Sequence, residues 1–404
     1  MTSFKLALSN LAHDRVRSVV SVVGAGFAVV LIFMQLGFLG ALKNTATLLL
    51  ERLDFDLLIT STEYLDMSRP GKVKRDRLAQ AQSVPGVEGV TPLTTTQALW
   101  KNPTDDPVRG GRRWPITTLA VDPGQLDRTF TPEERGVFKD EQDREAHKAA
   151  LERVGVVLLD RRSRPDFGKV YDPEQPNALG AMKPGTMTEV NGRQVELGGY
   201  FEIGTGFSYA GLLVMSEETH QSLTGRSPDE VSFGLVHLKP GQDPEVVAAE
   251  MRKTLPKDVR VYTRKGISEQ EQSFWISKTA VGTFFFFGVL LALFVGAIFV
   301  YQMMVADIKK HLPEYATLKA MGYPFGYLFR VVVWQALLLA VGGYLFGVAA
   351  SYPLYELTRQ QANFPMEMTL ERLGFVLALT VGMCVGSGLV AVRKVRTADP
   401  ADLF

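Results

Sequence analysis

The residues able to do acid–base, nucleophilic or metal chemistry are few in this sequence, and no catalytic spacing groups them. Five histidines lie singly, without an HExxH pattern, at positions 13, 147, 220, 237 and 311. The Gly-Ser-Gly of residues 386–388 stands inside an apolar run and is not part of a GxSxG nucleophile turn. The single cysteine, Cys384, can build neither an intrachain disulfide nor a metal site, and we expect it to be a small packing residue. The sequence therefore predicts a chain that is not an enzyme, with no catalytic residue and no metal.

A phosphate-binding loop is also missing from the sequence. No GxxxxGK[ST] pattern occurs, so the chain has no P-loop with which to hold ATP and Mg²⁺. The basic run at 161–164 is typical of a solvated turn, and a net charge of +1 indicates no polyanionic partner such as nucleic acid. We expect no cofactor bound by this chain. Energy from ATP would have to arrive through a separate subunit.

Four long apolar segments set the organisation of the chain. Each reaches the ~20 residues that a helix needs to cross ~30 Å of hydrocarbon. Overall hydropathy hides them, because a hydrophobic content of 46% and a mean hydropathy of +0.05 are diluted by one long globular stretch. We expect a membrane α-helical protein of four transmembrane helices, with a large α+β extracytoplasmic domain inserted between the first two. The first apolar run is too long for a cleaved signal peptide and is expected to be an uncleaved anchor.

Basic residues beside the apolar runs give the orientation. They flank the N-terminal side of the first run, the loop after the second and the end of the fourth, as Lys5, Arg15, Arg17, Lys309, Lys310, Lys319, Arg330, Arg393, Lys394 and Arg396. The positive-inside rule then places both termini in the cytoplasm. In chain order we expect a cytoplasmic amphipathic helix (1–17), span 1 (18–42), the extracytoplasmic domain (43–275), span 2 (276–305) and a cytoplasmic coupling loop (306–328). Span 3 (329–351), a short external loop (352–370), span 4 (371–392) and a cytoplasmic tail (393–404) follow.

The amphipathic pattern of residues 1–17 has two interpretations. Phe4, Ala7, Leu8 and Leu11 recur at helical spacing, which favours a helix along the inner membrane surface. The other interpretation is a helical extension of span 1.

The inserted domain shows mixed local patterns. Short β-rich runs lie at 54–60, 115–121, 154–160, 231–238 and 259–263. Helical patterns lie at 72–83, 132–153 and 244–255, and 101–113 is expected to be a surface loop. Asn191-Gly192 is a strong two-residue hairpin signal.

The spans carry packing signals but no Asp, Glu, Lys, Arg or His in their central parts. Ion-coupled transporters usually place such groups near mid-membrane, so an ion gradient is not the expected energy source. Gly343 and Gly347 in span 3, like Gly382 and Gly386 in span 4, have the spacing that allows close helix approach, either within the bundle or at a dimer seam.

A short helix is expected in the loop between spans 2 and 3. Pro313 and Glu314 suit its first turn, Lys319 suits its last turn, and Gly322 is placed to end it. Its apolar ridge consists of Tyr315, Leu318 and Met321. This ridge either packs against the bundle or fills a groove of a partner.

The whole chain resembles an FtsX/MacB-type ABC transporter permease, and more narrowly the DevC branch of cyanobacterial-type glycolipid export. The similarity is carried by MQLGF (34–38), LLDRRSRPDFG (158–168), DIKKHLPEYATLKAMGY (307–323) and SGLVAVRKVRTADPADLF (387–404). The resemblance implies a homodimer in a bacterial inner membrane that docks a separate ATPase on the helix 313–321. It also implies a periplasmic membrane-fusion adaptor, an outer-membrane duct and mechanotransmission from ATP hydrolysis to the external domain.

Three functions stay open at this point. The first is the permease of an exporter for a lipid, glycolipid or other amphiphile. The second is a lipoprotein-releasing permease, and the third is an FtsX-like signal relay that does not transport. A neighbouring adaptor gene would favour the first, and a lone ATPase gene with hydrolase partners the third.

Overall fold

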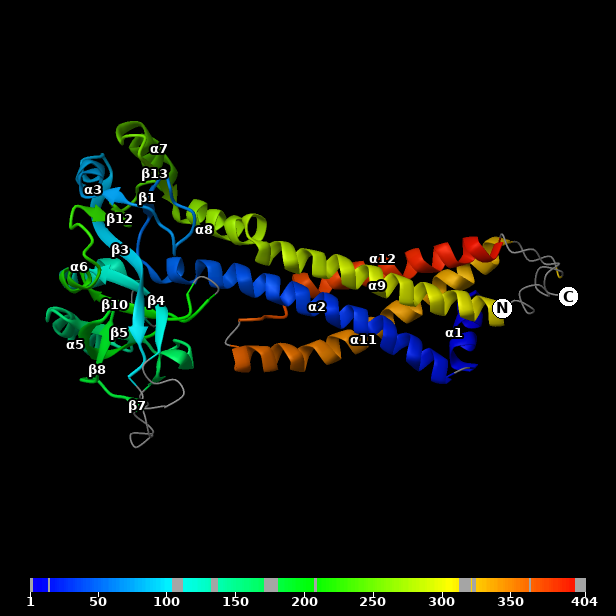
Figure 1. Ribbon diagram of the computed structural model, residues 1–404. Helices are drawn as coiled ribbons and strands as arrows, with labels where there is room; N and C mark the ends of the chain where they lie inside the picture. The colour runs from blue at the N-terminus through cyan, green and yellow to red at the C-terminus, as the bar shows by residue number, and fades with distance from the viewer. Residues whose placement is uncertain are drawn as a thin grey trace. The chain divides into compact units, whose positions relative to one another are not determined.

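The computed structural model describes residues 3–13, 15–103, 112–131, 137–170, 181–206, 209–311, 321, 325–362 and 365–396. The chain divides into two compact units (Figure 1). The helical unit comprises Met1–Ala41 and Thr279–Phe404, and the α+β unit comprises Leu42–Lys278. The boundary between them falls inside one long helix, α2 (Arg15–Arg52).

The helical unit is built from α1 (Ser3–His13), the first part of α2, α9 (Ala280–Lys310), α11 (Phe325–Ala362) and α12 (Leu370–Arg396). Figure 1 shows α9, α11 and α12 lying alongside α2. Within the described residues four segments are long and apolar enough to cross a membrane: Ser18–Arg52, Ala280–Lys310, Phe329–Arg359 and Leu370–Arg393. The predicted set of four apolar helices is thus confirmed.

Several small side chains are buried inside the helical unit, while large aromatic side chains of α9 face outward. Ala28, Ala336 and Cys384 are fully or almost fully buried in one cluster, so Cys384 is a packing residue as expected. Phe287 and Phe294 on α9 are 62% and 64% exposed. Large apolar side chains on the outside suit a bundle whose surroundings are hydrocarbon.

Helix α1 is a separate helix that packs against α11. The ring of Phe4 meets the edge of the Trp334 ring at a centroid distance of 5.2 Å, and Ala7 is fully buried. The apolar stripe predicted for this segment therefore contacts protein at these two positions.

The α+β unit is organised around a nine-stranded sheet with strand order β13-β1-β12-β3-β4-β10-β5-β9-β8. Its strands are β1 (Leu57–Ser61), β3 (Val87–Lys101), β4 (Arg113–Val121), β5 (Val156–Asp160), β8 (Met187–Val190), β9 (Arg193–Phe201), β10 (Leu212–Ser216), β12 (Phe233–Leu238) and β13 (Val259–Thr263). Two small strand pairs, β2 (Val73–Lys74) with β11 (Glu230–Val231) and β6 (Lys169–Val170) with β7 (Ala181–Met182), lie outside it.

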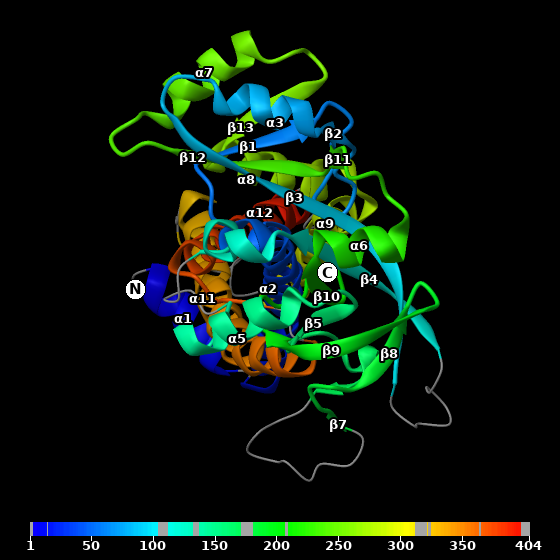
Figure 2. The same cartoon turned by 90° about the vertical axis from the view of Figure 1, so that its left-hand side faces the viewer.

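The first half of the sheet carries two helices on one face. Figure 2 shows α3 (Arg75–Gln82) and α7 (Pro244–Thr254) on the same side of β13, β1 and β12. Ala81 and Met251 from these helices pack with Ile59 and Val236 from the strands. The first strand, β1, lies between β12 and β13, the last two strands along the chain.

The second half closes on itself through the long strand β3. The pairings run β3–β4–β10–β5–β9–β8, and β8 pairs back to β3 at Trp100 and Lys101. The fully buried Trp100 packs inside this ring of strands with Leu159 and Leu213, and its indole N–H donates to the carbonyl of Phe167 at 2.8 Å. Helices α4 (Leu126–Thr129), α5 (Glu141–Leu151) and α6 (Glu217–Thr224) complete this half.

Local signals were accurate at the hairpin and less so at the charged helix. Asn191 and Gly192 join β8 to β9 with φ of 51° and 78°, which is the conformation that a type I′ turn requires. The helix predicted over 132–153 is shorter. Helix α5 begins at Glu141, because Asp140 caps it by accepting a hydrogen bond from the Asp143 amide at 2.8 Å. Residues 132–136, and 104–111 of the predicted loop, lie outside the described residues.

Candidate functional site

The predicted ATPase-coupling helix is largely beyond what the structure describes. Pro313, Glu314, Tyr315, Leu318, Lys319 and Gly322 lie outside the described residues, and the helix remains a prediction. Met321 is described and is 62% exposed.

A polar contact joins α9 and α11, the two helices on either side of the predicted coupling segment. Near the end of α9, Asp307 accepts a hydrogen bond at 3.0 Å from the side-chain amide of Gln335 on α11. Gln335 is only 3% exposed. His311 is buried beside the same aspartate, with its Nδ1 3.0 Å from the Asp307 carbonyl oxygen. The base of the predicted coupling segment is therefore held by a partly buried contact between α9 and α11.

Gly343 and Gly347 bring α11 close to α2 within the helical unit. A Cβ atom at Gly343 would lie 2.9 Å from the Ala25 Cβ and 3.2 Å from the Gly26 backbone nitrogen. A Cβ atom at Gly347 would overlap the side chain of Val29. A side chain at either position would push the two helices apart, so both glycines serve the packing of one chain.

Gly382 and Gly386 on α12 are placed differently. A Cβ atom at either position would meet nothing within 4 Å. These glycines do not support a contact with the described residues, and the dimer seam suggested by their spacing remains a prediction.

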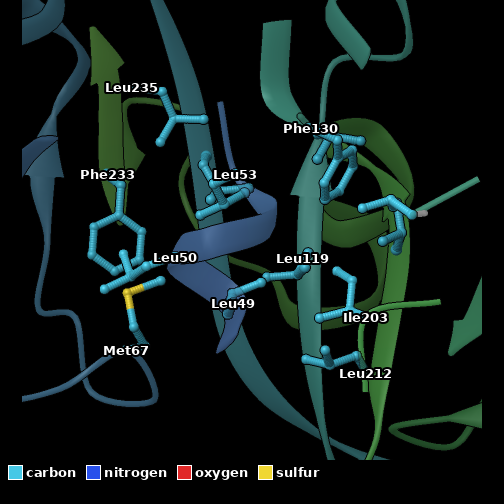
Figure 3. Close-up of a cluster of buried hydrophobic side chains, with 14 of the residues drawn as sticks. Leu49, Leu50, Leu53, Met67, Leu119, Phe130, Ile203, Leu212, Phe233 and Leu235 are labelled. Carbon is cyan, nitrogen blue, oxygen red and sulfur yellow. The ribbon is translucent and has the colours of Figure 1, made fainter. Parts of the chain in front are cut away.

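The end of α2 is part of the core of the α+β unit. The helix does not stop with the apolar run at residue 42 but continues to Arg52. Leu49, Leu50 and Leu53 are at most 1% exposed. Figure 3 shows them between the strands carrying Phe233 and Leu235 and those carrying Leu119 and Leu212. The first membrane-capable helix thus ends inside the hydrophobic core of this unit.

Arg264 ties this helix end to the segment that leads back toward α9. It is the first residue of α8 (Arg264–Ser273), which is followed by the π-helix Phe274–Lys278. Its guanidinium donates to the carbonyl oxygens of Leu50 at 3.1 Å, Leu53 at 2.8 Å and Phe55 at 2.9 and 3.2 Å. It also lies over the Phe55 ring, 4.2 Å from the centroid. The charge lies at the C-terminal, electronegative end of α2. It bonds the carbonyl of Leu50 in the last turn of the helix and those of Leu53 and Phe55 just beyond it.

A buried acidic cluster lies further along α8. The Tyr64 hydroxyl donates to the fully buried carboxyl group of Glu271. Burial raises the pKa of Glu271 to about 8, and the nearby Asp66 adds to the rise. Asp66 is held by Arg69 at 2.7 Å, and Arg69 also lies over the ring of Phe274, 5.4 Å from its centroid. This cluster fixes the loop after β1 against the last turn of α8.

The polar cavities of the α+β unit lack a catalytic arrangement in the part of the chain that is described. A cavity of about 820 Å³ is lined by Ser68, Thr95, Thr96 and Arg226, among others. His220 lies 2.8 Å from the Thr96 hydroxyl, and burial lowers its pKa to about 4, so it is neutral at pH 7. No group of three His, Cys, Asp or Glu side chains among the described residues could hold a metal ion.

Sequence reasoning missed Arg264, Glu271 and the role of Leu49, Leu50 and Leu53. The helical pattern at 46–52 was a usable signal for Leu49 and Leu50. Nothing local distinguishes Arg264 or Glu271 from other charged residues of an exposed helix.

Two protein families match the sequence. Residues 18–254, more than half of the chain, match the MacB-like periplasmic core domain, and residues 286–400 match the FtsX-like permease C-terminal domain. A comparison with curated protein sequences finds no match.

Two solved structures are similar to part of the chain. The periplasmic region of MacB from Actinobacillus actinomycetemcomitans is 13% identical, with 54% of this chain and 92% of that chain covered and a TM-score of 0.36. The extracellular domain of YknZ, a noncanonic ABC-type transporter from Gram-positive bacteria, is 11% identical, with 52% and 99% covered and a TM-score of 0.34. The chain thus combines a MacB-like periplasmic core domain, an FtsX-like C-terminal region and four membrane-capable helices. It belongs to the FtsX/MacB-type ABC transporter permeases.

Proposed function

We propose that this permease works in a DevC-type exporter that moves a lipid, glycolipid or other amphiphile. A separate ATPase subunit binds ATP and Mg²⁺ and docks on residues 313–321. The chain forms a homodimer in a bacterial inner membrane with both termini in the cytoplasm. Its α+β unit meets a membrane-fusion adaptor that leads to an outer-membrane duct, and it receives motion rather than substrate.

The single observation that carries the proposal is the place where α2 ends. Leu49 and Leu50 belong to the helix that contains the first membrane-capable segment, and Leu53 follows directly after its last residue. All three are also core residues of the α+β unit. A close-packed core transmits displacement because its side chains have little room to adapt. A shift of this helix end therefore acts on the strands of the unit directly.

Two further features support the same function. The central parts of the spans hold no Asp, Glu, Lys, Arg or His, which suits an energy source outside the bundle. The partly buried contact between Asp307 and Gln335 ties α9 to α11 at the base of the segment proposed to meet the ATPase. Together they support a permease that is driven from the cytoplasmic side.

The test is reconstitution of the purified chain with its partner ATPase. The chain alone should show no ATP hydrolysis above background, and hydrolysis by the ATPase should change when the chain is added. Co-purification with mass spectrometry should recover an adaptor and a bound amphiphile. A cysteine at Ser227 should react with an impermeant maleimide in spheroplasts, whereas a cysteine at Ala316 should not. The reverse labelling pattern would rule out the orientation and the export direction.

A further inference from the structure

Arg264 connects two segments of the α+β unit that are far apart in sequence but both continue into membrane-capable helices. The end of α2 follows the first apolar segment, and α8 with the π-helix precedes α9. The guanidinium of Arg264 bonds Leu53 across 211 positions of sequence. One side chain thus joins the entry and the exit of the chain in this unit.

The contact is more extensive than an ordinary helix cap. A helix end usually obtains its capping groups from residues close to it in sequence or from water. Here three carbonyl oxygens, those of Leu50, Leu53 and Phe55, share one guanidinium that also stacks on the Phe55 ring. The planar fork of arginine supplies several donors at once, which the ammonium group of lysine cannot reproduce.

The same two segments also share a core. Ile267, one turn after Arg264 on α8, is fully buried in the cluster that contains Leu50 and Leu53. On the other side of the helix end, the Asp54 amide donates to the Thr129 carbonyl at 2.9 Å. The end of α2 and α8 are therefore joined by an apolar contact through Ile267 and by a polar contact through the guanidinium of Arg264.

We propose that Arg264 is a positioning residue for force transmission, which makes the end of α2 and α8 move as one body. The inference rests on the proposed function, because it assigns the contact through which motion of the membrane helices reaches the α+β unit. Without the guanidinium, the end of α2 loses the donors for three carbonyls and can shift against α8 while both segments stay folded.

The experiment measures the distance between α2 and α8 in the full chain bound to its ATPase. Spin labels are placed on cysteines introduced at Glu51 and at Glu269, which are exposed positions on the two helices. Distances are recorded without nucleotide and after trapping with ATP and vanadate. With Arg264 present, we expect one narrow distribution that is the same in both states.

Arg264→Gln should broaden the distribution and make it depend on nucleotide. The amides of Leu53 and Asp54 should exchange hydrogen at least about tenfold faster, since charge-assisted bonds to this helix end are lost. The matched control is Arg252→Gln, which removes an arginine that donates to one carbonyl, that of Val261, at 3.0 Å. The control should leave the distance distribution unchanged.

The outcomes separate a positioning role from a purely structural one. A variant that melts earlier but keeps a narrow, nucleotide-independent distance would overturn the proposal. If Arg264→Gln fails to fold, Arg264→Lys is measured in the same way, and a distribution identical to that of the unsubstituted chain would overturn the proposal as well. Absence of ATPase binding by the unsubstituted chain would refute the proposed function. In that case the width of the distance distribution, measured without nucleotide, still decides the role of Arg264.

Discussion

The Tyr64 hydroxyl donates a hydrogen bond to the carboxyl group of Glu271, and both side chains are buried where α8 approaches its π-helix. Because desolvation disfavours the charged form, the pKa of Glu271 rises from 4.5 to about 8 on folding. Because Glu271 has a higher pKa in the folded state, its protonation contributes to the free energy of unfolding. This contribution is complete below pH 4.5 and is lost as the pH rises through about 8.

We therefore predict that the α+β unit loses stability between pH 5 and 8, by roughly 1 kcal/mol per pH unit from Glu271. Glu271→Gln, which cannot ionise, should flatten this slope and raise the melting temperature at pH 8. The measurement is thermal unfolding in detergent at several pH values. Burial also raises the pKa of Asp160, to about 6. Stability therefore also falls with rising pH at lower pH values, both in the unsubstituted chain and in Glu271→Gln. Glu269→Gln, at an exposed position of the same helix, is the control, and an equal effect of the two substitutions would contradict the assignment.

A second prediction concerns the end of α2. Leu50→Ala should lower the free energy of unfolding of the α+β unit by about 2–5 kcal/mol, because it leaves a cavity in a fully packed cluster. Leu99→Ala, at a position that is 47% exposed, should change it by only about 0.5 kcal/mol. Chemical denaturation followed by tryptophan fluorescence measures both. Equal effects would show that α2 is not part of this core.

The glycines of the helical unit should respond differently to the same substitution. Gly347→Leu should destabilise the bundle by about 1–3 kcal/mol or more, since the new side chain meets Val29 of α2. Gly382→Leu should leave the thermal stability of the bundle nearly unchanged, because a Cβ there meets no atom within 4 Å. If Gly382 also lies at a dimer seam, its substitution should lower the dimer fraction in light scattering. Matching losses of stability for both variants would contradict the α2–α11 contact.

The coupling ridge gives a prediction that rests on the sequence. One buried apolar side chain contributes ~1.5–3 kcal/mol to a contact, and an unpaired charge in its place adds a desolvation cost. Leu318→Asp should therefore abolish pull-down of the ATPase by the tagged permease while its level in the membrane stays normal. Lys310→Gln is the control and should have little effect. Normal ATPase binding by Leu318→Asp would show that the ridge packs against its own bundle.

The general layout was predictable because its signals are local. Long apolar runs report four membrane-capable helices, and Asn191-Gly192 reports a hairpin, without reference to the rest of the chain. The end of α2 was harder to predict. The sequence after residue 42 turns partly polar, and the partners of Leu49 and Leu53 come from several strands, from Leu58 of β1 to Leu235 of β12.

The candidate site was less predictable than the layout. Arg264 has an ordinary sequence context, and its importance arises only when β13 places it beside the end of α2. The same holds for Glu271, whose burial depends on the loop that carries Tyr64 and Asp66. The charge density of 132–153 was misleading for a different reason, because Asp140 starts the helix in the middle of that stretch.

The position of β1 between β12 and β13 has a consequence for biogenesis. The chain is synthesised in sequence order, so β1 waits for both of its neighbours until nearly the whole unit has been made. During this time the cluster that contains Leu49, Leu50 and Leu53 lacks Phe233 and Leu235 of β12 and Ile267 of α8. Pairing between segments so distant in sequence is slow, and apolar segments that wait for partners are prone to aggregation. The nine-stranded sheet is therefore completed only after β12 and β13 have been made.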